Sequence, residues 1–176
     1  MKFKKTLIKN LFIGMHEGFK DNRGIFKRMY CVDIFKKKFN FNFKQANMCF
    51  NPKKGTFRGL HYQIKKYKED KIIQIVKGET FHIILDIRKK SKSYKKFFTY
   101  KLRDNTGDFL IIPKGCAHGY LTLKQNSTII YFTTNFYNKN FSRGINVKDP
   151  LLKNLKLPHK INIISKQDNT WQKIKF

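Results

Sequence analysis

Short runs rich in Ile, Phe, Tyr, Val and Thr recur along the middle of the chain, and their spacing restricts the folds that it can adopt. Between about residues 44 and 134 these runs alternate with Gly, Pro, Asn and Asp, the residues that favour turns. Because no long helical crossover separates the runs, the pattern predicts an all-β sandwich or barrel. The expected strands are Gln45 to Phe50, Thr56 to Gln63, Lys71 to Val76, Thr80 to Ile87, Phe97 to Leu102, Phe109 to Ile112, Gly119 to Leu123 and Thr128 to Thr133.

Helical signals are weaker. Val32 to Phe39 is expected to form about two turns, and Asp149 is expected to cap a short helix that begins at Pro150. The first 15 residues start with basic side chains, as a signal peptide does, but Lys9 and Asn10 break the apolar run and no small-residue cleavage site follows. We therefore expect a first strand there. Since no repeat or linker is evident, we expect a single domain spanning residues 1–176.

Charge is the most unusual part of the composition. The chain has 39 Lys plus Arg against 11 Asp plus Glu, and a net charge of +28 attracts nucleic acid, anionic membranes or an anionic substrate. The lysines occur in scattered short groups, which a compositional bias explains as well as a selected surface does. No recognition helix or basic and aromatic strip is evident, and no stretch reaches the roughly 20 apolar residues of a membrane span. We therefore expect neither nucleic acid nor a membrane as partner.

The three cysteines, Cys31, Cys49 and Cys116, are odd in number and far apart. Because they contain no Cys-x-x-Cys pair, they favour neither a disulfide framework nor a thiolate zinc site. Free thiols of this kind are typical of the reducing cytoplasm, where we expect the protein to reside.

Two patterns of Gly and His residues stand out within the expected strands. They consist of Gly55, His61, Gln63, Lys71 and Gly78, and of Gly107, Pro113, Gly115, His118 and Thr122. Their spacing resembles the paired motifs of the cupin family, which implies a jelly-roll, double-stranded β-barrel with short peripheral helices. Since alternate side chains of a strand point to one face, His61, Gln63 and His118 are expected to converge on one cavity.

That cavity is expected to favour an anion over a metal ion. A metal-binding cupin offers three His and a carboxylate, whereas this chain has Gln63 in place of a His and Lys71 in place of the carboxylate. Since a cation repels a divalent metal, we expect no metal and no cofactor. An imidazole and an ammonium instead suit proton abstraction next to a carbonyl, with His61 as base and Lys71 at the enolate oxygen. Tyr131 suits the proton donor on the opposite face.

From about Asp21 to Pro158 the chain is similar to the dTDP-4-dehydrorhamnose 3,5-epimerases, cofactor-independent enzymes of dTDP-rhamnose synthesis. The order and spacing of several segments carry this resemblance, and each segment alone is a weak signal. The segments are 21–26, 45–47, 57–63, 71–73, 86–89 with Ser91 and Ser93, 112–120, 131–137 and 147–150. The resemblance implies epimerisation of a nucleotide-linked 4-keto-6-deoxy sugar, by removal and return of a proton at C3, C5 or both.

The resemblance also implies roles for individual residues. It makes His61 the general base with Asp149 as its orienting partner, Tyr131 the acid, and Lys71 the group that holds the enolate oxygen. The implied substrate-binding residues are Arg23 and Arg58 at the diphosphate, Phe26, Gln45 and Asn47 at the nucleoside and sugar, and Gln63 and His118 in the sugar pocket. A homodimer is implied, in which the region around Arg23 serves the neighbour's site.

The chain departs from the family pattern at three positions. Arg28 stands where the family commonly has Glu, and Phe132 where a Lys often follows the tyrosine, which leaves the nucleotide base open. Val147 stands where a Trp usually precedes the aspartate by two residues, so the region beside His61 is expected to differ in shape.

The sequence alone leaves other functions open. A sugar 3,4-ketoisomerase on the same fold is the nearest alternative enzyme, and the motifs do not distinguish one epimerised centre from two. A non-catalytic module that binds polyanions through its +28 surface is the alternative from another class. A metal-dependent cupin oxygenase is disfavoured by Gln63 and Lys71.

Overall fold

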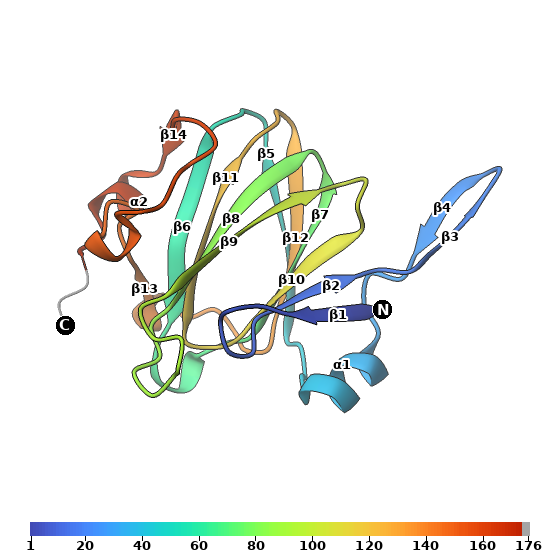
Figure 1. Ribbon diagram of the computed structural model, residues 1–176, viewed down its shortest axis with the longest axis horizontal. Coiled ribbons are helices and arrows are strands. Elements are labelled where there is room, and N and C mark those ends of the chain that lie inside the picture. The colour runs from blue at the N-terminus through green and yellow to red at the C-terminus, as the bar shows by residue number, and fades with distance from the viewer. Residues whose placement is uncertain (174–176) are drawn as a thin grey trace.

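Two antiparallel sheets packed face to face make up the body of the computed structural model, which describes residues 1–173 (Figure 1). In spatial order, the first sheet contains β1 (Lys2–Lys5), β2 (Phe12–Met15), β10 (Asp108–Ile112), β7 (Lys71–Lys77), β12 (Ser127–Thr133) and β5 (Gln45–Asn51). The second contains β13 (Ser142–Gly144), β6 (Thr56–Gln63), β11 (Cys116–Thr122), β8 (Glu79–Asp86) and β9 (Phe97–Arg103), and the short β14 (Ile163–Ile164) pairs with β6 in parallel.

The remaining elements are small and peripheral. A hairpin of β3 (Gly18–Asp21) and β4 (Gly24–Lys27) extends away from the sheets, at the right of Figure 1. The helical segments are α1 (Val32–Phe39), α2 (Lys166–Thr170) and the 3₁₀ turns η1 (Lys65–Tyr67), η2 (Lys139–Phe141) and η3 (Pro150–Leu152). None of the helices within residues 1–173 is long and apolar enough to cross a membrane.

The all-β prediction is confirmed. Every strand expected between residues 45 and 133 forms, although β11 begins at Cys116 instead of Gly119, and the helix expected at Val32–Phe39 forms with those bounds. Asp149 caps η3 by accepting a hydrogen bond from the Leu151 N–H (2.9 Å). The first 15 residues form two paired strands, β1 and β2, instead of one, because the polar break at Asn10 is a turn.

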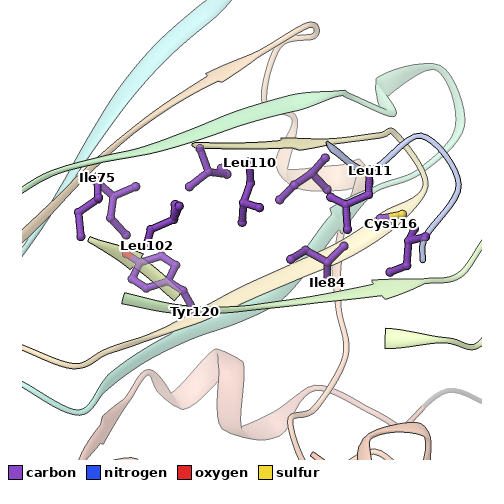
Figure 2. Close-up of a cluster of buried hydrophobic side chains, with 11 residues drawn as sticks. Leu11, Ile75, Ile84, Leu102, Leu110, Cys116 and Tyr120 are labelled. Atoms are coloured by element: carbon purple, nitrogen blue, oxygen red, sulfur yellow. The ribbon is translucent and has the colours of Figure 1, made fainter. Parts of the chain in front are cut away.

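Apolar side chains from both sheets fill the space between them. In Figure 2, Ile75 and Leu110 of the first sheet lie opposite Ile84, Leu102 and Tyr120 of the second. Each of these side chains is at most 7% exposed. The inner core therefore joins strands that are distant in the sequence.

The outer faces of both sheets are covered as well. Phe109 and Ile111 of β10 point outward and pack with Phe35 of α1 in a cluster of aromatic rings. On the second sheet, Leu85 packs with Leu152 of the C-terminal segment. Strands buried on both faces read as near-continuous apolar runs, which explains the pattern in the sequence.

A buried carboxylate fixes the loop that follows β8. Asp86 is fully buried, and it accepts hydrogen bonds from the Arg88 guanidinium (2.8 Å) and from the Ser91 and Ser93 hydroxyls (2.7 and 2.6 Å). Burial opposes its charge, but these hydrogen bonds outweigh burial and lower the pKa of Asp86 to about 2. Arg88 also donates to the Lys9 carbonyl (2.7 Å), so the cluster ties the turn after β1 to the second sheet.

We predict that Asp86→Asn lowers the free energy of unfolding at pH 7 by about 2 kcal/mol, because the variant loses the charge that Arg88 stabilises. Since the folded pKa lies below the unfolded value of 3.8, the difference between wild type and variant should persist above pH 4 and shrink as the pH falls towards 2. Denaturant unfolding at several pH values measures it. Asp33→Asn, at an exposed position of α1, is the control, and an equal loss in both variants would contradict the prediction.

Candidate active site

Two adjoining cavities lie between the sheets, where β5, β7 and β12 face β6 and β11. A pocket of about 430 Å³ is lined by the predicted residues Gln45, Asn47, His61, Gln63, Lys71 and Tyr131. A cavity of about 240 Å³ shares His61, Lys71 and Tyr131 with that pocket and adds Arg58 and His118. The structure thus brings together the predicted site residues apart from Arg23, Phe26 and Asp149.

A β-bulge in β6 turns Arg58 and His61 to the same side of the sheet. His61 pairs with His118 of β11, but Arg58 pairs with Tyr120, so three steps along β6 match two along β11. The extra residue shifts the alternation of side chains by one position. As a result Phe57 and Leu60 both pack in the outer core, while Arg58 and His61 both line the inner cavity.

The residue at the bulge has to be glycine. Gly59 has a φ of +123°, a value that side chains rarely tolerate, and a Cβ there would collide with the Cα of Gly119 on β11. The glycine of the Arg-Gly-x-His motif is therefore required by the close approach of β6 and β11, while its Arg and His are the functional side chains.

His61 is held by a carboxylate from the C-terminal segment. The Asp168 Oδ1 lies 2.6 Å from the His61 Nε2, and Asp168 is 4% exposed. Asp168 also accepts hydrogen bonds from the Gly59 N–H (3.1 Å) and the Trp171 Nε1–H (3.2 Å). Burial opposes the charge, but the hydrogen bonds, with that from His61 the largest, outweigh it and lower the pKa of Asp168. The ionised carboxylate therefore accepts the Nε2 proton of His61.

Asp149 does not orient His61, and that prediction is wrong. Its buried carboxylate caps η3, and Asp168 occupies the position beside His61. Sequence reasoning left the tail unassigned, yet it holds a helix-start signature. Ser165 and Asp168 form a Ser-x-x-Asp pattern in which the Ser165 Oγ accepts from the Asp168 N–H (3.0 Å).

Trp171 supplies an aromatic ring beside His61. Its ring stands nearly perpendicular to the imidazole, with centroids 6.5 Å apart, and it lies against Gly144 of β13, where a Cβ would collide with the indole. The substitution of Val147 for the family's usual Trp therefore does not leave the region without an indole, since a later residue provides one.

Lys71 is fixed by Glu69, an acid that sequence reasoning missed. The Lys71 Nζ lies 2.9 Å from the Glu69 Oε1, and both side chains are mostly buried. Gln63 donates to the Glu69 Oε2 (2.9 Å) and to two backbone carbonyls, and it accepts from the Asn138 N–H (2.7 Å). Gln63 therefore holds the surrounding loops together and helps to fix the Glu69–Lys71 ion pair.

The inner cavity holds the remaining predicted groups. Burial raises the pKa of Tyr131, so its phenol keeps its proton at neutral pH. Burial, reinforced by the neighbouring His82, Lys71 and His61, lowers the pKa of His118 well below its usual value, so this imidazole is neutral. The Arg58 Nε donates to the Asn51 Oδ1 (3.0 Å), which orients an otherwise exposed guanidinium.

Arg23 and Phe26 do not reach the pocket of their own chain. Both belong to the protruding hairpin, where the Arg23 side chain is 86% exposed and pairs with Asp21 (2.6 Å), and Phe26 is 67% exposed. By contrast, Gln45 is fixed at the pocket through the hydrogen bond that its Oε1 accepts from the Tyr137 N–H (2.7 Å).

The arrangement suits proton transfer at a carbon next to a carbonyl. A histidine paired with a carboxylate lies on one sheet, a protonated phenol lies on the other, and an ammonium lines the space that they share. Within residues 1–173, no group of three or more His, Cys, Asp or Glu side chains is placed to hold a metal ion.

Known proteins are similar to this chain in sequence and in architecture. A family model described as dTDP-4-dehydrorhamnose 3,5-epimerase matches residues 5–175. An enzyme of that name from Shigella flexneri is 34% identical over 175 residues, covering 98% of this chain and 96% of its own.

Solved structures agree. The Bacillus anthracis dTDP-4-dehydrorhamnose 3,5-epimerase, with TDP and PPi bound, is 28% identical with a TM-score of 0.91 over 98% of this chain and 99% of its own. The Legionella pneumophila dTDP-6-deoxy-D-glucose-3,5-epimerase, in complex with dTDP-4-keto-L-rhamnose, is 26% identical with a TM-score of 0.91 over 98% of this chain and 92% of its own. The chain therefore belongs to the dTDP-4-dehydrorhamnose 3,5-epimerase family of isomerases.

Proposed function

We propose that this protein epimerises a dTDP-linked 4-keto-6-deoxy sugar at C3, C5 or both, without a cofactor. The observation that carries the proposal is the His61–Asp168 pair on one sheet, with Tyr131 on the other sheet lining the same cavities. Both carbons are adjacent to the C4 carbonyl, so their protons are acidic enough for an imidazole to remove when the resulting enolate is stabilised.

His61 is the base. Because the Asp168 carboxylate accepts the Nε2 proton, a neutral His61 carries its lone pair on Nδ1, and no described residue bonds that nitrogen. The side chain is 42% exposed, so Nδ1 is accessible to a substrate in the pocket. Asp168 also stabilises the imidazolium that forms when Nδ1 takes the proton.

Lys71 and Tyr131 complete the reaction. The ammonium of Lys71, held by Glu69, stabilises the negative charge that develops on the C4 oxygen. The Tyr131 phenol returns a proton from the face opposite His61, which inverts the carbon. Since the pKa of Tyr131 is raised, the phenol is in its donor form at neutral pH.

Binding of the nucleotide and diphosphate is assigned to residues that line the two cavities. Arg58 offers a guanidinium for phosphate oxygens, and Gln45 and Asn47 line the pocket for the nucleoside and sugar. Arg23 and Phe26 reach a pocket only from a second copy of the chain. This assignment therefore requires a homodimer.

Exposed apolar side chains support such a homodimer. Met48 and Phe50 on the edge strand β5 are 68% and 53% exposed, and Phe19 and Ile25 on the hairpin are 81% and 57% exposed. An isolated two-stranded hairpin is marginally stable in water, so it gains from packing on another surface. We infer that the hairpin of one copy packs on the β5 region of the other.

A cytoplasmic location is also proposed. Cys31, Cys49 and Cys116 are free thiols. Free thiols of this kind are stable in a reducing compartment.

Incubation with dTDP-4-keto-6-deoxyglucose in heavy water tests the activity. We expect deuterium to appear at C3, C5 or both, and NMR measures this incorporation. Exchange at one carbon alone would identify a single-centre epimerase. A product with its carbonyl at C3 would identify a 3,4-ketoisomerase instead. Absence of exchange with folded protein on any 4-keto nucleotide sugar, together with steeply salt-dependent polyanion binding, would favour the binding module.

Two aspartate variants test the base. Asp168→Asn removes the negative charge that stabilises the His61 imidazolium and leaves one acceptor oxygen where the Gly59 N–H and the His61 Nε2–H now use two, so we expect kcat to fall at least about 100-fold. Asp149→Asn is the matched control, since an asparagine can still cap η3, and we expect kcat to change less than about threefold. Steady-state kinetics measures both, with thermal unfolding to check the fold. Equal losses in the two variants would refute the assignment.

Sedimentation equilibrium tests the homodimer. We expect the mass of two chains for the wild type and of one chain for the double variant Met48→Glu, Phe50→Glu, because charges on the β5 surface oppose apolar packing. The monomeric variant should also show a raised KM, since Arg23 and Phe26 no longer reach a neighbouring pocket. Leu7→Glu, at an exposed apolar position outside this surface, is expected to stay dimeric. A monomeric wild type would overturn the proposal.

A further inference from the structure

A chain of buried polar groups extends behind His118, and the reaction proposed above does not use it. Thr80 and His82 of β8 are both fully buried, and they follow the same inward alternation as Ile84. The Thr80 Oγ1 lies 2.9 Å from the His82 Nε2, and the His82 Nδ1 lies 2.9 Å from the His118 Nε2. The two rings are nearly parallel, with an interplanar angle of 9°.

Only one arrangement of the protons on Thr80, His82 and His118 pairs every buried donor with an acceptor. If the His82 Nε2–H donated to Thr80, the Thr80 hydroxyl proton would be buried without an acceptor, since its only described partner is His82. If Thr80 donates instead, His82 carries its proton on Nδ1 and gives it to the His118 Nε2. Every buried proton is then paired, which favours this arrangement.

This arrangement also decides which nitrogen of His118 carries the proton that faces the cavity. With Nε2 as an acceptor, a neutral His118 carries its proton on Nδ1, and no described residue bonds that nitrogen. His118 is 8% exposed and lines the 240 Å³ cavity beside Lys71 and His61. The free Nδ1–H is therefore available to a ligand in that cavity.

The surroundings keep the ring uncharged. The groups that share its cavity are Cys49, Arg58, His61, Lys71, Tyr120 and Tyr131, and none of them is a carboxylate. Burial lowers the pKa of His82 to about 3, and burial followed by its charged neighbours lowers the pKa of His118.

We infer that Thr80 and His82 are positioning residues that hold His118 as its Nδ1–H tautomer, a neutral hydrogen-bond donor for an oxygen of the bound sugar. The inference rests on the proposed function for the identity of the ligand. It does not make His118 an acid or a base, because a donor that keeps its proton orients the sugar without exchanging with it.

Nitrogen-15 NMR of labelled histidines tests the tautomer without any substrate. We expect the His118 Nδ1 to be protonated and the Nε2 unprotonated, with no titration between pH 5 and 8. The His118→Gln variant assigns the signals. A proton on Nε2, or titration of the ring in this range, would overturn the inference whether or not the protein proves to be an epimerase.

Two variants of nearly equal size separate positioning from packing. His82→Asn places an amide donor near the position of Nδ1, so we expect the His118 tautomer and the pH profile of kcat to be retained. His82→Asp places a carboxylate acceptor there, which should move the His118 proton to Nε2 and add an ionisation to that profile. Identical His118 spectra in the two variants would show that residue 82 only fills space and would overturn the inference.

Ligand addition tests the donor role. dTDP-rhamnose should shift the His118 Nδ1–H signal, whereas dTDP, which lacks the sugar, should leave it in place. If both nucleotides bind and neither shifts the signal, the donor role is wrong. If the protein binds neither nucleotide, the proposed function fails and the donor role fails with it, while the tautomer is still decided by the spectrum of the free protein.

Discussion

One extra residue in β6 decides which side chains enter the space between the sheets. Without the bulge at Gly59, strict alternation would turn either Arg58 or His61 into the outer core, where Phe57 and Leu60 now pack. With it, both polar side chains face the cavity and both apolar ones stay buried. The Gly59 N–H also donates to Asp168, so the same irregularity that aims the histidine helps to anchor its carboxylate.

Three of the few carboxylates are buried beside basic side chains. The chain has 11 acidic residues against 39 basic ones, yet Asp86, Asp168 and Glu69 are all buried beside Arg88, His61 and Lys71. Each acid thereby fixes the direction of a basic side chain. Within residues 1–173, most of the remaining basic side chains lie on the surface.

The sequence predicts features that depend on neighbouring residues better than contacts between distant parts of the chain. The strands and α1 follow from alternation and turn residues, because these act over a few neighbouring positions. The convergence of His61, Lys71, Tyr131 and His118, which lie on four different strands, was predicted from the spacing of the Gly and His motifs and from the family resemblance. The pairing of His61 with Asp168 depends on how the tail folds across β6, which no local pattern specifies. His82 was missed for a related reason, since its partner His118 lies on another strand. Glu69 lies only two residues before Lys71, but it stands among several other lysines, so the sequence did not single out this ion pair.

The two groups proposed to move protons stand on different sheets. His61 belongs to the second sheet and Tyr131 to the first, and the side chains between those sheets, such as Ile73 and Ile129, set how far apart the layers lie. The gap across which a sugar carbon must be inverted is therefore the thickness of the sandwich itself. A methyl group added or removed deep in the inner core would alter that gap. The packing of the inner core therefore sets the distance between the proposed base and the proposed acid.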